Sequence, residues 1–174
     1  AKEVNLVFAA SQKAAEKLAV PQKTIVVGNP VRPEVFLQDR QQQRNRLGVG
    51  NRVCILSFGG SLGARRINEA MADLAQWHTK NRDFYHIHAT GSRGVELFAE
   101  LAKEKGFSGS SHIQVQEYIQ DMPQLLAAAD LVICRAGALT LAELEAAGKA
   151  AVLIPSPNVA ENHQYYNARV LEKR

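Results

Sequence analysis

Residues 57–71 read "SFGGSLGARRINEAM", and their glycines stand where an apolar run changes into a helical pattern. Glycine lets the backbone approach a ligand closely, and the unpaired N–H groups at a helix N-terminus attract anions. The segment therefore predicts a phosphate-binding turn between a strand and a helix. Taken alone, a tight turn that binds nothing explains these glycines equally well.

Two familiar phosphate-binding motifs do not fit this turn. A Walker loop continues with Gly-Lys-Ser/Thr, whereas Ala64 and Arg65 follow Gly63, so ATP hydrolysis is not expected. A dinucleotide fingerprint has the spacing G-x-G-x-x-G and an acidic residue at the end of the next strand. The corresponding segment, "HATGSRG" (88–94), contains no acidic residue, which disfavours NAD.

A second loop of the same kind reads "CRAGALTLAELEAAG" (134–148), with Gly137 at the turn. Two such helix N-termini at the carboxyl edge of one parallel sheet form the usual crevice for a nucleotide. Glu143 lies one to two turns into the second helix, where its carboxylate could accept hydrogen bonds from two ribose hydroxyls. Taken alone, this carboxylate is explained by its favourable interaction with the helix dipole.

Apolar runs alternate with helical patterns along the chain, which predicts an α/β fold with a doubly wound parallel sheet. Strands are expected at 4–8, 24–28, 52–58, 84–90, 112–118, 131–134 and 151–155. A short helix is expected from Ser11, and longer ones around 67–75, 94–105, 121–128, 138–147 and 161–173. The segment "GNPVRPEVF" (28–36) is predicted to be a linker, because its prolines disfavour both helix and sheet.

The composition limits the possible partners. The chain has 174 residues and a net charge of +4, without the basic cluster and interleaved aromatics of a nucleic-acid groove. No apolar run approaches the roughly 20 residues that a membrane span needs, so any contact with an anionic membrane is expected to be peripheral. Cys54 and Cys134 stand inside apolar runs, which predicts buried thiols of a reduced compartment, the cytoplasm.

Six motifs, "GNPVR", "GGSLGAR", "HATG", "YIQDM", "CRAGALTLAE" and "NHQYYNA", occur here in this order. In that order they resemble the MurG-type family of bacterial N-acetylglucosaminyltransferases, which convert lipid I to lipid II in peptidoglycan synthesis. The resemblance implies a GT-B fold, in which two Rossmann-like domains face a cleft. Residues 1–30 would be a remnant of the N-terminal domain with the start of the linker, and residues 31–174 a Rossmann-like C-terminal UDP-sugar-binding domain, truncated at its C-terminus.

The same resemblance implies binding roles toward the donor, UDP-N-acetylglucosamine. Ser61 would meet the diphosphate, Arg32 the uridine or its phosphates, and Ile119 the uracil edge through its backbone. Gln164 would bind sugar hydroxyls, beside His163, where family members often carry a second glutamine. The second loop would wrap the diphosphate and sugar, with its last residue on the ribose, through Ala138, Leu139, Thr140, Leu141, Ala142 and Glu143.

The implied reaction is an inverting displacement at the anomeric carbon by a hydroxyl of lipid I. The general base and the lipid I surface would lie on the N-terminal domain, so no catalytic residue is assigned in this chain. No cofactor is expected, and the absence of a D-x-D pair favours stabilisation of the leaving diphosphate by helix dipoles and arginine rather than by a metal. His86 and His88 share one strand face, but without a recognisable third ligand a structural role is expected.

Three alternatives remain at the level of the sequence. The chain could be the donor-binding subunit of a two-chain dolichol-pathway transferase, or a noncatalytic module that binds a sugar nucleotide. A nicotinamide oxidoreductase is the third, weakened by the missing acidic residue. The family reading also implies a cytoplasmic protein that is peripheral on the inner face of the cell membrane.

Overall fold

The computed structural model describes residues 3–172, and the chain divides into two units between Val31 and Arg32. In the first unit two parallel strands, β1 (Val7–Ala9) and β2 (Thr24–Val26), are joined by α1 (Gln12–Glu16) and the 3-10 helix η1 (Pro21–Lys23). The Ser11 hydroxyl oxygen accepts a hydrogen bond from the backbone N–H of Ala14 at 3.2 Å. This is an N-cap, and it confirms the helix predicted from Ser11.

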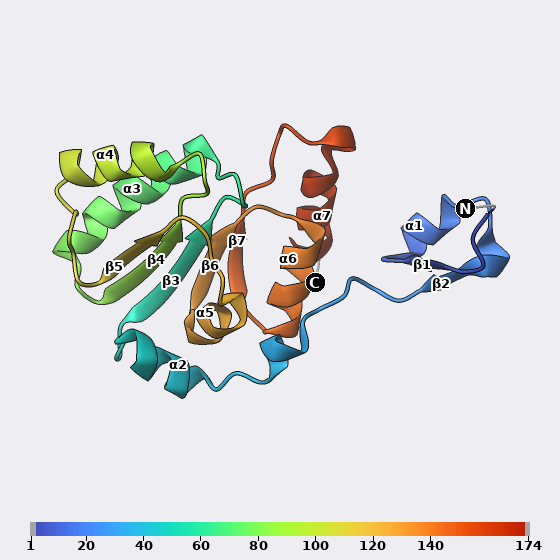
Figure 1. The fold of residues 1–174 in the computed structure, drawn as a ribbon, viewed down its shortest axis with the longest axis horizontal. Helices are drawn as coiled ribbons and strands as arrows, with labels where there is room; N and C mark the ends of the chain where they lie inside the picture. The colour runs from blue at the N-terminus through green and yellow to red at the C-terminus, as the bar shows by residue number, and fades with distance from the viewer. Residues whose placement is uncertain (1–2, 173–174) are drawn as a thin grey trace. The chain divides into compact units, whose positions relative to one another are not determined.

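The second unit is built on a five-stranded sheet whose strands are all parallel (Figure 1). Its strands are β3 (Val53–Phe58), β4 (Phe84–Ala89), β5 (Ile113–Gln116), β6 (Leu131–Cys134) and β7 (Ala150–Leu153), in the order β5-β4-β3-β6-β7. The chain therefore builds outward from β3 to β5 and returns to the other side of β3 for β6. This reversal places a crevice at the carboxyl ends of β3 and β6, and it confirms the predicted fold class.

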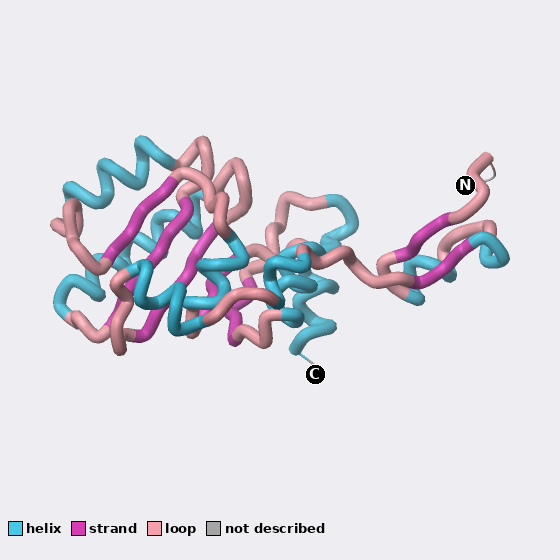
Figure 2. Tube along the Cα trace, turned by 60° about the horizontal axis from the view of Figure 1, so that its bottom comes forward, coloured by secondary structure: helices cyan, strands magenta, loops and turns pink. Residues whose placement is uncertain are grey.

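Helices cover both faces of this sheet, as Figure 2 shows in cyan. The helices of the unit are α2 (Arg40–Leu47), α3 (Arg65–Lys80), α4 (Val95–Glu104), α5 (Met122–Ala128), α6 (Ala138–Ala146) and α7 (His163–Glu172). One buried cluster joins α3 and α4 to the sheet, with Ile67 and Phe98 packed near Ile55. The other joins α5 and α6 to the opposite face, around Leu56 and Val132. Neighbouring residues of β3 thus face opposite layers, as strand alternation requires.

Both cysteines are fully buried in the second cluster, as predicted. Burial raises the pKa of the Cys54 thiol to about 11 and that of the Cys134 thiol to about 12. Because the thiolate is the reactive form, both side chains are inert packing groups at neutral pH.

Several predicted boundaries were wrong for local reasons. The predicted linker ends in a 3-10 helix, η2 (Pro33–Phe36), which begins at a proline because the first helical N–H needs no partner. Helix α7 begins at His163 rather than at 161, since Glu161 and Asn162 have φ of 52° and 51°. The predicted end of that helix at 173 lies outside the described residues. The assignment of residues 1–30 to another domain remains a prediction.

Helix α2 was not predicted, because its sequence, "RQQQRNRL", has no apolar stripe. Asp39 caps its start by accepting a hydrogen bond from Gln42 N–H at 2.6 Å, and Gly48 ends it in the left-handed region at φ 68°. The buried side chain of Arg44 then fixes α2 to the amino edge of the sheet. It donates to the carbonyl groups of Ala128, Gly50 and Arg52.

Asp130, just before β6, completes this attachment. One of its carboxylate oxygens accepts from Arg44 at 3.0 Å and from the Cys54 N–H at 2.8 Å, while the other accepts from Arg40. Burial alone would raise the pKa of the Asp130 carboxyl, but these three hydrogen bonds outweigh it and hold the pKa below its ordinary value. The charge of Asp130 therefore stabilises the fold above that ordinary value, and this contribution is lost as the pH falls through the folded-state pKa.

We predict that Asp130→Asn lowers the free energy of unfolding by about 2–3 kcal/mol near neutral pH, because it leaves the buried Arg44 without a counter-charge. The difference from wild type should begin to shrink as the pH falls below 3.8, where the carboxyl of the unfolded wild type takes up a proton, and should be lost once the pH passes the lowered pKa of the folded state. Urea unfolding at several pH values measures both effects. Glu69→Gln, which breaks surface pairs to Arg65 and Arg66, is the control and should change stability little. A pH-independent difference would contradict the charge-based account.

Candidate functional site

The glycine loop between β3 and α3 packs directly against the loop that follows β4. A Cβ atom on Gly63, whose φ is 82°, would lie 2.1 Å from the carbonyl oxygen of Thr90. A Cβ on Gly91 would lie 2.0 Å from the Gly63 nitrogen. Backbone hydrogen bonds from Ser92 N–H to Ser61 O (3.1 Å) and from Arg93 N–H to Leu62 O (3.3 Å) join the loops. The glycines are therefore required by close backbone contact.

The N-termini of two helices lie beside this loop. The N-cap residues of α3 and α6 are Ala64 and Gly137, and neither has a polar side chain that could cap the helix. Helix α6 begins directly after β6, the strand that neighbours β3 in the sheet. Both helices thus present the positive ends of their dipoles at this edge of the sheet, without a side-chain cap from the N-cap residue.

A cleft of about 540 Å³ lies between these N-termini. Its walls come from the loops after β3, β6 and β7 and from α7, and its polar side chains are Arg65, Arg66, Arg135, Thr140, Ser156, Asn158 and Gln164. Cationic side chains, glycine backbone and small polar groups line it together. This set of groups fits a ligand that combines phosphate with hydroxyl groups.

Two predicted residues, Thr140 and Gln164, line this cleft. The Gln164 Oε1 atom accepts a hydrogen bond from Ser156 N–H at 2.9 Å, which fixes the orientation of the amide. The Gln164 NH₂ group is therefore the part that remains for a ligand, and it can only donate. Ser61 is exposed on the glycine loop but lies outside the cleft lining.

Arg32 and Glu143, predicted at separate parts of the donor, contact each other. The Arg32 Nη2 and Nε atoms lie 2.8 and 2.9 Å from the same Glu143 oxygen, Oε1. The Glu143 side chain is only 15% exposed, while that of Arg32 is 49% exposed. The pair joins the segment after Val31 to the second turn of α6.

The remaining predicted residues differ in exposure. The side chains of Ile119 and Leu141 are buried in the core, so a ligand could meet only their backbone groups. Ala138 and Leu139 are exposed and Ala142 is half-buried. The binding roles of these positions remain predictions.

Arg135 is a lining residue to which sequence reasoning gave no role. Its Nη1 atom donates to the carbonyl groups of Ile154 (3.2 Å) and Pro155 (2.9 Å), so it holds the loop after β7 beside the loop after β6. Burial lowers the pKa of its guanidinium, which still stays charged at neutral pH. A signal was present, since a charge directly after an apolar strand and before a glycine turn is placed at the crevice.

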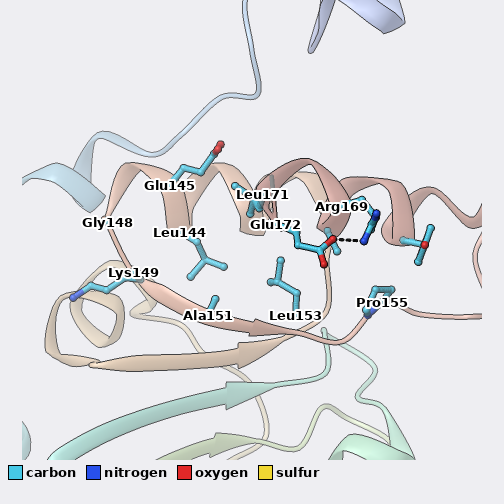
Figure 3. Close-up of a pocket in the computed structure, with 12 residues that line it drawn as sticks. Leu144, Glu145, Gly148, Lys149, Ala151, Leu153, Pro155, Arg169, Leu171 and Glu172 are labelled. Atoms are coloured by element: carbon cyan, nitrogen blue, oxygen red, sulfur yellow. Dashed lines mark hydrogen bonds and ion pairs between the residues drawn. The ribbon is translucent and has the colours of Figure 1, made fainter. Parts of the chain in front are cut away.

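A second groove, of about 680 Å³, lies between α6, β7 and α7 and is shown in Figure 3. Its lining is mostly apolar, including Leu144, Leu153 and Leu171, and its Arg169 and Glu172 are paired with each other. It contains none of the predicted donor residues. We therefore assign the functional site to the cleft between the helix N-termini.

Neither a metal-binding cluster nor a membrane-spanning helix is found within residues 3–172. No group of three or more His, Cys, Asp or Glu side chains there is placed to hold a metal ion. His86 and His88 instead share hydrogen bonds with Ser57, at 2.8 Å each. No helix in the described part of the chain has the length and apolar character needed to cross a membrane.

Comparison with known families gives a match to the glycosyltransferase family 28 C-terminal domain over residues 54–174. The chain is 42% identical over 165 residues to UDP-N-acetylglucosamine--N-acetylmuramyl-(pentapeptide) pyrophosphoryl-undecaprenol N-acetylglucosamine transferase of Desulforudis audaxviator, covering 93% of this chain and 44% of that protein. The protein of the same name from Listeria monocytogenes is 45% identical over 154 residues, 87% of this chain and 41% of its own length. This chain thus spans less than half of these relatives.

Two solved structures have a fold similar to that of this chain. Acinetobacter baumannii MurG matches with a TM-score of 0.61 and 30% identity, covering 88% of this chain and 42% of that chain. Anabaena HepE in complex with UDP matches with a TM-score of 0.56 and 20% identity, over 98% of this chain and 55% of that one. The second likeness concerns the fold alone.

We predict that Gly63→Ala destabilises the protein more than Gly109→Ala. Both glycines have similar positive φ, 82° and 76°, but a Cβ at Gly109 meets nothing within 4 Å. Gly109→Ala should cost about 1–2 kcal/mol from backbone strain alone. Gly63→Ala should add at least about 1–3 kcal/mol, since the Thr90 carbonyl must move. Thermal unfolding of both variants measures the difference, and equal losses would show that the two loops do not pack as described.

Proposed function

Because the chain belongs to glycosyltransferase family 28, whose C-terminal domain it contains, we propose that it is the donor-binding half of an inverting glycosyltransferase. The reaction is transfer of N-acetylglucosamine from UDP-N-acetylglucosamine to lipid I, which gives lipid II for peptidoglycan synthesis. The observation that carries this proposal is the cleft where the N-termini of α3 and α6 meet beside Arg135. The names of the relatives at about 40% identity support the choice of donor and acceptor.

The donor's diphosphate lies, in this proposal, between the two helix N-termini. The glycine backbone of residues 59–63 and the positive end of the α6 dipole face its oxygens. Arg135 supplies a fixed positive charge, because its other contacts are to neutral carbonyl groups rather than to an acid. As the glycosidic bond breaks, negative charge develops on the leaving diphosphate, and these preorganised donors stabilise it.

This placement of the diphosphate also places the nucleoside and the sugar of the donor. Glu143 binds the ribose hydroxyls through its carboxylate, while Arg32 holds that carboxylate in place through Oε1. Ile119 meets the uracil edge with its backbone. Gln164 donates from its NH₂ group to a sugar oxygen, since its carbonyl is already used by Ser156.

The acceptor side of the reaction lies outside this chain. A general base must remove the proton of the attacking hydroxyl, and we assign it, with the lipid I surface, to the N-terminal domain of the whole enzyme. Because lipid I is membrane-linked, the enzyme works at the surface of an anionic membrane as a peripheral protein on its inner face. We propose no cofactor and no nucleic-acid partner.

The main test of donor binding is Glu143→Gln, which keeps the size of the side chain but removes its charge. Charge-assisted hydrogen bonds contribute about 1.5–3 kcal/mol each, so UDP affinity should fall roughly 10-fold to 150-fold. Calorimetric titration with UDP and 2′-deoxy-UDP should show that wild type prefers UDP and that the variant loses much of this preference. Glu145→Gln, on the exposed side of the same helix, is the control and should bind like wild type.

Equal discrimination between the two nucleotides by wild type and Glu143→Gln would remove Glu143 from the site. If the carboxylate served only the helix dipole, the substitution would cost about 0.3–1 kcal/mol of stability and leave UDP binding unchanged.

A further prediction concerns the diphosphate. Because helix N-termini and Arg135 carry its charge in this proposal, UDP affinity should be unchanged when EDTA replaces Mg²⁺ or Mn²⁺ at constant ionic strength. Arg135→Gln should weaken binding about 10-fold or more with or without the metal. A large loss of affinity on chelation in the wild type would contradict stabilisation by the protein alone.

A further inference from the structure

A line of buried polar side chains runs beneath α3 from the sheet to the glycine loop. Ser57 and His86 lie on neighbouring strands β3 and β4, and His88 follows on β4; all three are fully buried. Asn68, on α3, is 1% exposed. These four buried polar side chains need a reason, because each costs free energy unless it is hydrogen-bonded.

The hydrogen bonds of this line have one possible direction. The Asn68 Nδ2 atom donates to the Thr90 carbonyl at 2.9 Å, so Oδ1 of the same amide faces His88 Nε2 at 3.2 Å. An amide oxygen only accepts, and His88 Nε2 therefore carries the hydrogen. Burial lowers the pKa of His88 to about 4, so the ring is neutral and its Nδ1 accepts from the Ser57 hydroxyl at 2.8 Å. The Ser57 oxygen in turn accepts from His86 Nε2 at 2.8 Å.

The line ends under the phosphate-binding loop. The Thr90 carbonyl that Asn68 holds is the group against which Gly63 packs. A Cβ on Gly94 would lie 2.1 Å from Asn68 Nδ2, so this amide also packs against the loop after β4. The backbone N–H of Asn68 bonds to Ala64 O in the first turn of α3. Asn68 therefore joins the start of α3 to the end of β4.

We propose that His88 is a positioning residue for the phosphate-binding loop. By donating from Nε2 it keeps the Asn68 amide turned so that NH₂, and not the oxygen, faces the Thr90 carbonyl. With the amide reversed, two acceptors would face each other and the loop after β4 would move away from Gly63. This inference rests on the proposed function for its link to the donor's diphosphate, while the effect on the loop stands without a nucleotide.

His78 is a buried histidine that lacks the hydrogen bonds of His88 within the described part of the chain. It is also fully buried and stacks on Phe84 with ring centroids 4.8 Å apart. Within residues 3–172 neither of its ring nitrogens has a hydrogen-bond partner, whereas both nitrogens of His88 are used. His78 is therefore a matched control, since it has the same residue type and burial and belongs to the same layer.

The test compares His88→Gln with His88→Asn. The glutamine NH₂ can take the place of Nε2 and donate to Asn68, whereas the shorter asparagine reaches only the Nδ1 position beside Ser57. Both remove the ring and should lower the melting temperature similarly. We expect His88→Gln to bind UDP within about 3-fold of wild type, and His88→Asn to bind it at least about 10-fold more weakly.

Amide hydrogen exchange in the nucleotide-free protein gives an independent result. In His88→Asn the amides of Ser92 and Arg93, which bond to the glycine loop, should exchange faster relative to the β3 amides, but not in His88→Gln. His78→Gln should lower stability without changing UDP affinity or these two amides. If His88→Asn does not fold, Ser57→Ala, which frees His88 Nδ1, should loosen the same amides.

Equal UDP affinity and equal exchange in His88→Gln and His88→Asn would overturn the inference, as would unchanged exchange in Ser57→Ala. A wild type that binds no UDP would overturn the proposed function. In that case exchange at Ser92 and Arg93 would still decide whether His88 positions the loop.

Discussion

The close contact of two backbones, at Gly63 and at Thr90–Gly91, is the constraint on which the rest of the site depends. No side chain fits between these segments, so the wall of the cleft on that side is made of peptide groups. Peptide groups have little freedom once their hydrogen bonds are formed, and they carry dipoles that cannot rotate away from an anion. The α3 N-terminus is thereby held at a fixed place relative to β4, and the shape of the cleft wall at the glycine loop does not depend on rotamers.

Charged side chains have different roles at the two edges of the sheet. At the amino edge, Arg44 and Asp130 form an ion pair and also hydrogen-bond to the surrounding carbonyl and N–H groups. These two charged side chains therefore attach α2 to the sheet. At the carboxyl edge, the N-cap residues of α3 and α6 give no side-chain cap, and Arg135 donates to the neutral carbonyl groups of Ile154 and Pro155. Positive helix ends without a side-chain cap, together with a fixed guanidinium, favour a charged ligand, and the proposed donor site is therefore at the carboxyl edge.

The sequence was sufficient to predict the layers of the fold because apolar runs such as 52–58 report burial on both faces of a parallel strand. Helix α2 could not be predicted in the same way, since Arg44 finds its partners at residues 50, 52, 128 and 130, which only the fold brings near. The glycine turns were predicted as a phosphate site, but their packing on Thr90 depends on a neighbouring strand. The signal of Arg135 was its position between an apolar strand and a glycine turn, not a periodic pattern. Local pattern thus predicted the strands and most of the helices in their order, and contacts between distant segments decided α2 and the details of the cleft.

The internal hydrogen bond of Gln164 has a consequence for which chemical groups the cleft tolerates. With its oxygen held by Ser156 N–H, the amide offers only hydrogens to the cleft. A hydroxyl, a carbonyl or an ether oxygen can accept these hydrogen bonds. An ammonium group can only donate, so its N–H groups would face the N–H groups of the amide, and it would lose its water without compensation. In the donor-binding role proposed for this cleft, the direction of one hydrogen bond therefore selects against a free amino sugar, without any steric clash to exclude it.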